Sequence, residues 1–429
     1  MSKTFKIGII GLGQIGNYLY QELNLKKKDI LIKTGKKIKI IGISAKNRNK
    51  KRKYKINKNI FYSNPLKIIN LKPDLIFEVI GQPDGISKKI VETALKNKIH
   101  VITPNKALIA KHGNKLGKVA EINNVNLEFE ASVAGGIPIL KTIKEGLATN
   151  KITKVSGVLN GTTNYILSEM ENSNLNFKEV LTKAQKLGYA EPGNPKLDLN
   201  GYDALAKVRI LSSLSFNSKI SLNKCLMEGI ENIDLKDIKI SNQLGMRIKL
   251  LGLTELINGK LFERVHPCLV NKKSYIGNVN GVMNAIILKG KPVGVNILQG
   301  EGAGPEATSS SLLSDLLSIL KGGIKKPFGI SYSKQKKLRS YNLNNYSNSL
   351  YLRFEVKDVP GVMSKITDKL AKFNISIKRL IQTPSQKSKK ATIVMITHST
   401  VELNIQRCLK MINKDKYILK SPTLIRIFN

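Results

Sequence analysis

The sequence predicts an α/β protein with an N-terminal doubly wound parallel sheet, an α+β central domain and a C-terminal βαββαβ domain. Three observations predict it. A Gly-x-Gly-x-x-Gly loop directly follows the first apolar strand, and strands alternate with helices over residues 5–130. Residues 349–429 follow a strand–helix–strand–strand–helix–strand order. At 429 residues the chain is also too long for one ordinary core, so two or three domains are expected.

The first part of the chain alternates strands with helices. Residues 5–10 form an apolar strand, and the helix over 14–25 has Ile15, Leu19 and Leu23 on one face. Further strands are expected at 39–43, 74–79, 100–103 and 126–130, with a helix at 85–96. This alternation favours a Rossmann-type parallel sheet over residues 1–130.

The remaining chain divides into three expected parts. Residues 131–325, with Gly-rich turns, strands and long helices, form the second domain, and residues 326–348, rich in Lys, Ser, Asn and Tyr, form a linker. Residues 349–429 form the third domain. Its expected strands are 351–356, 375–382, 391–397 and 423–427, and its expected helices are 361–373 and 401–412.

Composition excludes several classes of protein. A hydrophobic content of 41% and a charged content of 24% are typical of a globular chain. No run of about 18 apolar residues is present, and the N-terminus lacks signal-peptide features, so a cytoplasmic protein is expected. Cys225, Cys268 and Cys408 are too scattered for a disulfide framework or a zinc site.

The formal net charge of +42 would ordinarily suggest a nucleic-acid partner. Here lysine is spread over the whole length, in the company of abundant Ile and Asn, and is not interleaved with aromatic residues for base stacking. Only residues 46–55 form a dense basic block. We therefore expect no nucleic-acid or membrane partner, and a chain that favours anionic small molecules.

The glycine loop has the spacing of a dinucleotide-binding turn. Gly11 permits the tight turn, Gly13 lets the backbone approach a pyrophosphate, and Gly16 lets the helix pack on the strand. Gln14 and Ile15 open the helix whose free N–H groups would bind the phosphates. The alternative is a tight turn that binds nothing.

Cofactor choice is expected at the end of the second strand. An acidic residue there would bind the ribose hydroxyls of NAD, but the sequence has Lys46 and Arg48 instead. Cations at this point suit a 2′-phosphate, so NADP(H) is favoured over NAD(H). The alternative is that this loop only shares the lysine bias of the chain.

Two lysines are candidates for carbonyl chemistry. Lys106 lies just past a strand end, where parallel sheets bind ligands, and Lys207 lies on a predicted helix four residues after Asp203. A lysine can supply a proton to a carbonyl oxygen. From spacing alone the alternative is a surface i,i+4 ion pair worth about 0.3–0.5 kcal/mol.

The chain resembles homoserine dehydrogenases in the order and spacing of its motifs. These motifs are Gly11 to Gly16, Thr103 to Lys106, Glu130 to Pro138, Leu159 to Leu167, Gly188 to Glu191 and Asp198 to Lys207. The resemblance implies that Lys106 and Lys207 are the catalytic pair, with Lys207 the proton donor. It also implies that Glu191 binds the substrate amino group and that Asp198 and Asp203 line the same pocket.

The resemblance implies two further sites in the second domain. The turn containing Gly302 would contact the nicotinamide end of the cofactor, as residues 299–321 return to that site. Backbone oxygens would hold a sodium ion, at the residues that match the family's segment: Glu130, Val133, Gly135 and Ile137.

The sequence departs from the family pattern in three places. Pro104 stands where a small residue is usual, and Glu306 lies close to the cofactor turn. One extra residue separates Glu191 from Asp198, which is expected to shift Glu191 relative to Asp203 and Lys207.

The third domain resembles an ACT domain. Its ligand turn would be Asp358 to Met363, where Pro360 and Gly361 precede a helix, and residues 375–379 with Gln382 continue the match. This implies threonine sensing, with a dimerising module that has lost its ligand as the alternative.

The sequence is therefore identified as a member of the homoserine dehydrogenase family. The resemblance implies a homodimer or higher oligomer that interconverts aspartate semialdehyde and homoserine, in threonine and methionine synthesis. The rival interpretations are another Rossmann dehydrogenase of a small amino or hydroxy acid, and an amino-acid-sensing regulator with a degenerate Rossmann domain.

Overall fold

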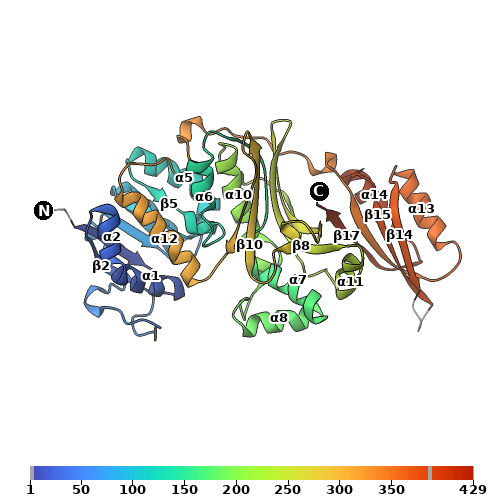
Figure 1. Cartoon of the computed structure of the whole chain (residues 1–429), viewed down its shortest axis with the longest axis horizontal. Helices are drawn as coiled ribbons and strands as arrows, with labels where there is room; N and C mark the ends of the chain where they lie inside the picture. The colour runs from blue at the N-terminus through green and yellow to red at the C-terminus, as the bar shows by residue number, and fades with distance from the viewer. Residues whose placement is uncertain (1–3, 385–388, 429) are drawn as a thin grey trace.

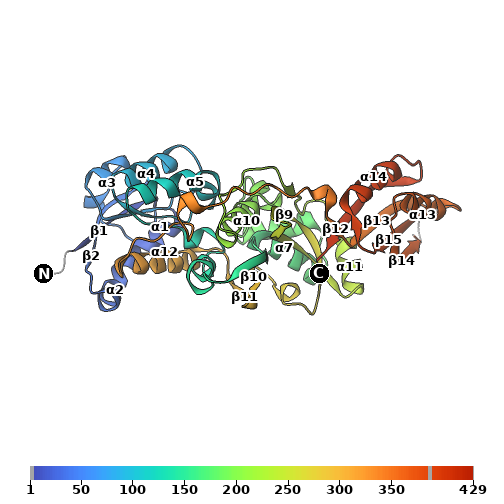
Figure 2. The same ribbon diagram turned by 90° about the horizontal axis from the view of Figure 1, so that it is seen from above.

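A computed structural model describes residues 4–384 and 389–428 of the chain. The molecule is elongated, with the N-terminal domain at one end, the C-terminal domain at the other and a mixed sheet between them (Figures 1 and 2). Among the described residues, no helix is long and apolar enough to cross a membrane.

The N-terminal sheet has five parallel strands in the order β2-β1-β3-β4-β5. They are β1 (Phe5–Ile10), β2 (Ile38–Ser44), β3 (Leu75–Glu78), β4 (His100–Ile102) and β5 (Leu127–Glu128). The helices are α1 (Gln14–Leu25), α2 (Lys27–Thr34), α3 (Leu66–Asn70), α4 (Ile86–Lys96) and α5 (Lys106–Ile122). The predicted doubly wound parallel sheet is confirmed.

One expected strand in this domain is wrong in length. The alternating segment 126–130 predicts five strand residues, but β5 has only two. Phe129 leaves the extended region with φ −152° and ψ 34°, and a 3-10 turn begins at Glu130. The strand stops because the chain turns here into the segment that leads to the central domain.

The chain returns to the N-terminal domain after the central sheet. Helix α12 (Pro305–Leu320) packs against α1, as Figure 1 shows in orange beside the blue elements. Leu312 and Leu316 are fully buried in the same core cluster as Ile9 and Phe77. This return places the start of α12 next to the glycine loop. The domain boundaries themselves stay a prediction.

The central domain is built on a mixed sheet covered by helices on one face. Its strands are β6 (Lys151–Val158), β7 (Leu226–Met227), β8 (Met246–Ile257), β9 (Lys260–Asn271), β10 (Met283–Lys291) and β11 (Gly294–Glu301). Its helices are α6 (Ile139–Lys141), α7 (Gly161–Ser173), α8 (Phe177–Lys186), α9 (Lys196–Leu199), α10 (Tyr202–Ser215) and α11 (Leu235–Gln243). Helix α10 contacts β8 on one side and α5 of the N-terminal domain on the other, so it links the two domains.

The C-terminal domain has the predicted βαββαβ order. Its main elements are β13 (Leu350–Lys357), α13 (Val362–Lys372), β14 (Ile377–Pro384), β15 (Lys390–Thr397), α14 (Glu402–Ile412) and β17 (Ile418–Ile427). A short pair, β12 (Ser347–Asn348) with β16 (Thr400–Val401), was not expected. Strand β17 pairs in parallel with β9, so that a ten-stranded sheet runs through both domains.

Two buried arginines join the C-terminal domain to the central domain. Arg353 on β13 binds Asp237 at 2.7 Å and Asp234 at 2.6 Å. Arg426 on β17 binds Glu228 at 2.8 Å. Removing one partner of the fully buried Arg353–Asp237 pair would cost about 3–5 kcal/mol, so this pair holds the two domains in a defined position.

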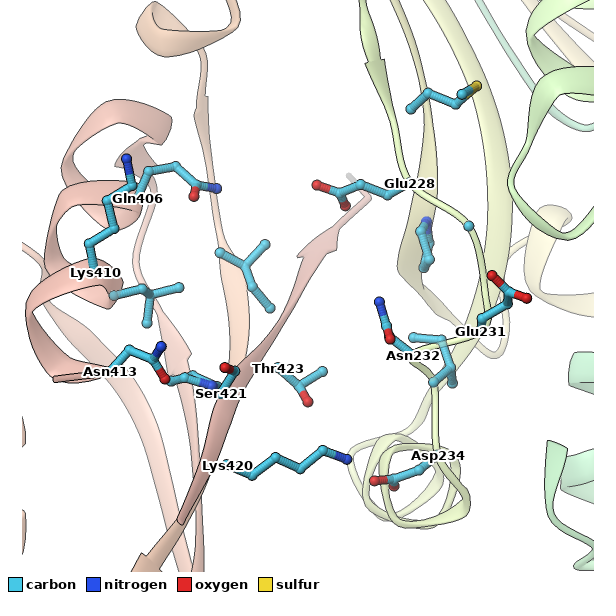
Figure 3. A pocket seen from close by; sticks show the side chains of 17 residues that line it. Glu228, Glu231, Asn232, Asp234, Gln406, Lys410, Asn413, Lys420, Ser421 and Thr423 are labelled. Carbon is cyan, nitrogen blue, oxygen red and sulfur yellow. The ribbon is translucent and has the colours of Figure 1, made fainter. Parts of the chain in front are cut away.

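A cleft of about 810 Å³ remains between these two domains beside the ion pairs. The acidic side chains Glu228, Glu231 and Asp234 line its central-domain side, and Lys410 and Lys420 line the other side (Figure 3). The cleft has the same distribution of charge as the ion pairs: the central domain supplies the acidic side chains and the C-terminal domain supplies the basic ones.

The expected linker over residues 326–348 packs closely on the rest of the chain. Phe328 is buried, and its ring packs against α5 where Gly113 and Gly117 leave room for it. Further along, Ser340 forms an isolated parallel β-bridge with Leu261 in β9. The segment therefore runs along the N-terminal and central domains instead of forming a free tether.

Candidate active site

The glycine loop has the shape that a pyrophosphate requires. Gly11 has φ +106°, and a Cβ there would lie 2.6 Å from the Val79 carbonyl oxygen. A Cβ on Gly16 would lie 2.0 Å from the Gly11 carbonyl oxygen. At Gly13, by contrast, no described atom lies within 4 Å of a Cβ position, and no described side chain caps α1. The N-terminus of α1 is therefore open to a phosphate.

A cavity of about 750 Å³ extends from this loop to the central domain. Eight of the site residues that the sequence singles out line it: Gln14, Ile15, Lys106, Gly135, Asp198, Asp203, Lys207 and Gly302. Gly135 and Gly302 approach each other closely, because a Cβ on Gly135 would lie 2.7 Å from the Gly302 backbone. The return of the chain through β11 and α12 therefore forms one wall of the cavity.

The centre of the cavity is a carboxylate between two ammonium groups. Asp203 Oδ1 lies 2.7 Å from Lys106 Nζ, and Asp203 Oδ2 lies 2.8 Å from Lys207 Nζ. Lys106 is the first residue of α5 in the N-terminal domain, whereas Asp203 and Lys207 share one face of α10. The predicted i,i+4 pair is confirmed, but it is buried, with side chains 8% and 7% exposed. It is not a surface ion pair.

The environment moves the pKa values of these groups in different directions. Burial is the largest influence on Lys207 and lowers its pKa, and Asp203 opposes that change without cancelling it. For Lys106 the charge of Asp203 dominates and raises the pKa. Burial alone would raise the pKa of Asp203, but the two lysines together hold it well below its ordinary value. Asp203 is thus a permanent anion.

Asn160 connects the aspartates of the cavity. Its Nδ2 donates to Asp198 at 2.8 Å and to Asp203 at 2.9 Å, while its Oδ1 accepts from the Thr163 N–H and caps α7. Sequence reasoning missed both contacts of Asn160 with the aspartates. The pKa of Asp198 is raised by burial and then by Asp203, so the shared amide donor helps to keep both carboxylates close.

Glu78 is a second residue that sequence reasoning missed. It ends β3 and is fully buried. Its Oε2 accepts from the Thr103 hydroxyl at 2.7 Å, and its Oε1 accepts from the Ser87 hydroxyl and the Ile80 N–H, both at 2.9 Å. Asn105, which caps α5, donates to the Gln82 carbonyl and reaches the same carboxylate at 3.5 Å. Glu78 therefore fixes residues 103–105, the turn between β4 and α5 from which Lys106 extends.

Glu191 lies near Lys106 but makes no ion pair with either lysine of the site. Its charge adds to the raised pKa of Lys106, after the contributions of Asp203 and Asp198. Its side chain is exposed, it does not line the cavity, and its backbone carbonyl accepts from Gln185. The extra residue before Asp198 lies in the exposed segment 192–194 that follows it. The role implied for Glu191 stays a prediction.

The basic block after β2 lies beside the glycine loop. Lys46 and Arg48 are exposed, and Arg48 donates to the Lys58 carbonyl at 3.3 Å. Arg52, which was not singled out, donates to the Leu12 carbonyl within the glycine loop at 3.2 Å. The block is therefore held at the phosphate end of the expected cofactor site.

The expected sodium segment runs along the cavity wall. The carbonyl oxygens of Glu130, Gly135 and Ile137 already accept hydrogen bonds, from the Val133 N–H, the Ser311 hydroxyl and the Ile139 N–H. Each carbonyl keeps a second lone pair, so the donor set suits a hard cation. The Glu130 carboxylate is occupied by the N–H groups of Leu140 and Lys141, and burial raises its pKa to about 7.

The segment expected to bind a ligand in the C-terminal domain forms a turn before α13, and its binding role stays a prediction. Gly361 has φ +83° and ends the turn where α13 begins. Gln382 on β14 donates to Asp358 at 3.5 Å, so two residues that the sequence links across 24 positions lie together.

Fold and site define the class of protein: a dinucleotide-binding oxidoreductase with a lysine–aspartate–lysine centre and a C-terminal ACT domain. Three family descriptions match the chain in order. They are the NAD-binding domain of homoserine dehydrogenase over residues 11–130, homoserine dehydrogenase over 138–317, and the ACT domain over 350–414.

Relatives match over the full length. Homoserine dehydrogenases of Neisseria gonorrhoeae and Helicobacter pylori are 37% and 35% identical, covering 99% and 100% of both chains. A crystal structure of a homoserine dehydrogenase from Thiobacillus denitrificans superposes with a TM-score of 0.91 at 31% identity, covering 100% of this chain and 99% of that one. The chain belongs to the homoserine dehydrogenase family, NAD(P)-dependent oxidoreductases that act on a CH–OH group.

Glu78→Gln tests the positioning of Lys106. The new amide places a donor against groups that themselves donate, so the corner at Thr103 and Asn105 should shift and turnover should fall about 10- to 100-fold. Steady-state kcat and KM would be compared with those of Asp84→Asn, which changes an exposed carboxylate that binds Lys111 and His112 on the same α5 surface. Unchanged turnover in Glu78→Gln would contradict the positioning role.

Proposed function

We propose that the chain reduces L-aspartate 4-semialdehyde to L-homoserine and catalyses the reverse reaction, with Lys207 as the proton donor. The observation that carries this proposal is the buried contact of Lys106, Asp203 and Lys207 in the cavity that begins at the glycine loop. Reduction of an aldehyde requires a hydride at carbon and a proton at oxygen. When bound, the nicotinamide cofactor supplies the hydride.

Lys207 is suited to deliver the proton. Its Nζ is fixed by Asp203 and by the Leu159 carbonyl at 2.5 Å, which leaves a third N–H for the substrate oxygen. Because burial lowers its pKa, the ammonium is a stronger acid than a lysine in water. Asp203 limits that change and keeps the group protonated.

The neighbouring groups bind and orient the substrate. Lys106 has a raised pKa and a side chain 41% exposed toward the cavity, so it is a permanent cation that attracts the substrate carboxylate. Asp198, held by Asn160, would accept from the substrate ammonium group. Glu191, whose charge already acts on Lys106, would share that contact.

A sodium ion is part of this proposal. The backbone oxygens of Glu130, Val133, Gly135 and Ile137 would hold it, and its role would be structural: to stabilise the segment that packs on the Gly302 turn. Threonine binding at the Asp358–Gly361 turn, assembly into homodimers or larger oligomers, and a cytoplasmic location belong to the proposal as well. Cys225, Cys268 and Cys408 are free among the described residues, which suits a reducing compartment.

NADPH is the proposed cofactor because the loop after β2 carries cations and no acid. In Arg48→Ala, kcat/KM with NADPH should fall about tenfold or more while the value with NADH stays nearly constant, since one charged hydrogen bond is lost. Arg407→Ala, at an exposed arginine on α14, provides the matched control. Equal losses with both cofactors, or none, would contradict the assignment of Arg48 to the 2′-phosphate.

The reaction and the proton donor are tested together by NADPH oxidation with aspartate semialdehyde. Wild type should be active, and Lys207→Ala should lose about 10²–10⁴-fold in kcat, the usual contribution of a general acid. Lys260→Ala, at an exposed lysine on β9, should behave as wild type. Full activity in Lys207→Ala would refute the proton donor. An inactive wild type that still binds NADPH would refute the substrate.

A further inference from the structure

A small cavity of about 160 Å³ lies where three parts of the chain meet. Strands β6, β8 and β9 of the central domain form its floor, residues 346–348 before β13 form one side, and Ser399 of the C-terminal domain lies on another. Its polar lining is dominated by groups that are cationic or can donate, with Lys154, Arg264, His266 and Tyr346 the most prominent.

Arg264 on β9 is held rigidly at this cavity and is incompletely paired. Its guanidinium lies 4.1 Å from the ring centre of Phe262 and 4.5 Å from that of Tyr346. Its Nη2 donates to Glu255 at 2.8 Å and to the Tyr346 hydroxyl at 3.0 Å. Its Nη1 is buried and has no partner among the described residues. A buried unpaired donor is costly, so this one indicates a missing acceptor.

His266 points to the same face of β9, two residues further on. It is 1% exposed, and its pKa is well below the ordinary value, first because of burial and then because of Arg426 and Arg264. Its Nδ1 lies 3.0 Å from the Pro267 carbonyl, which can only accept, and the Cys268 thiol donates to the His266 carbonyl, so we assign the proton of the neutral ring to Nδ1. Nε2 is then an acceptor, and it too has no partner within the described part of the chain.

Lys154 on β6 adds a third group. It lines the cavity and, within residues 4–384 and 389–428, makes no ion pair. Burial lowers its pKa; Glu255 opposes that change, while Arg264 and Lys289 add to it. Glu255 is the carboxylate shared by these cations. The nearby Arg426 is already neutralised by Glu228 and Glu402, so the cavity keeps an excess of positive charge.

We propose that this cavity binds one hydrogen phosphate ion. Arg264 Nη1, Lys154 Nζ and the Tyr346 hydroxyl would donate to its oxygens, and its P–OH would donate to His266 Nε2. The size agrees, because a cavity of about 150 Å³ holds a guest the size of benzene. The acceptor nitrogen distinguishes hydrogen phosphate from sulfate, which carries no proton at neutral pH.

The position of this ion has a consequence for regulation. It would bind residues of the central sheet and the segment before β13 at once, next to the C-terminal domain. A ligand that binds this joint in its docked form stabilises that form in proportion to ln(1 + [L]/Kd). Phosphate would therefore strengthen the docking of the ACT domain that the Arg353 and Arg426 ion pairs establish.

Isothermal titration of inorganic phosphate into the full chain tests the proposal. The protein is saturated with NADPH, so that phosphate cannot occupy the cofactor site. Wild type should show one saturable site per chain, with sulfate at matched ionic strength about tenfold weaker or more. Absence of saturable binding would overturn the site, and equal binding of sulfate would overturn the hydrogen phosphate assignment.

Two variants locate the binding. Lys154→Gln should weaken phosphate about tenfold or more, whereas Lys289→Gln should leave it unchanged. Lys289 is exposed on β10, lies beside Lys154 in the sheet register and does not line the cavity, so it matches the charge change. Tyr346→Phe, which removes only a hydroxyl, should also weaken binding. Wild-type affinity in both Lys154→Gln and Tyr346→Phe would place any bound phosphate elsewhere and overturn the inference.

Discussion

The structure depends on the placement of one carboxylate between two domains. Asp203 is buried on α10 of the central domain and binds Lys207 on its own helix and Lys106 on α5 of the N-terminal domain. A buried anion of this kind is tolerated only when it is paired and hydrogen-bonded. The pairing holds the N-terminal domain and the central domain together at the cavity where we propose that the reaction takes place, so the same contact would serve both packing and catalysis.

Several close contacts position the segments around Asp203 and its two lysines. Gly16 allows α1 to touch the Gly11 carbonyl, and Gly135 allows the cavity wall to touch the Gly302 turn. Glu78 satisfies four donors at the corner that carries Lys106. At the far end of the molecule, the pairing of β17 with β9 extends the central sheet into the C-terminal domain, and β9 in turn contacts α10.

Local periodicity was sufficient to predict the main elements of the C-terminal domain and the strands of the N-terminal sheet, but not the individual elements of the central domain. The helix over 14–25, the glycine loop and the βαββαβ order of the third domain follow from patterns within short windows, and so does the i,i+4 spacing of Asp203 and Lys207. Asn160 and Glu78 could not be predicted as site residues, because the contacts that connect them to the site, with Asp198, Asp203 and Thr103, span 25 to 43 positions. The parallel pairing of β17 with β9 has no local signal either. The expected proximity of Glu191 rests on a motif that the extra residue in this chain interrupts.

The pH dependence of kcat in Asp203→Asn tests most directly whether Asp203 controls the proton of Lys207. Lys207 must be protonated to act as the donor, so activity is lost as the pH rises through its pKa. Asp203 raises that pKa, and without its charge the pKa should fall. We predict that the alkaline limb of the kcat–pH profile moves to lower pH in the variant, and that the maximal kcat is reduced. An alkaline limb at the same pH as in wild type would contradict the claim that Asp203 controls the proton of Lys207.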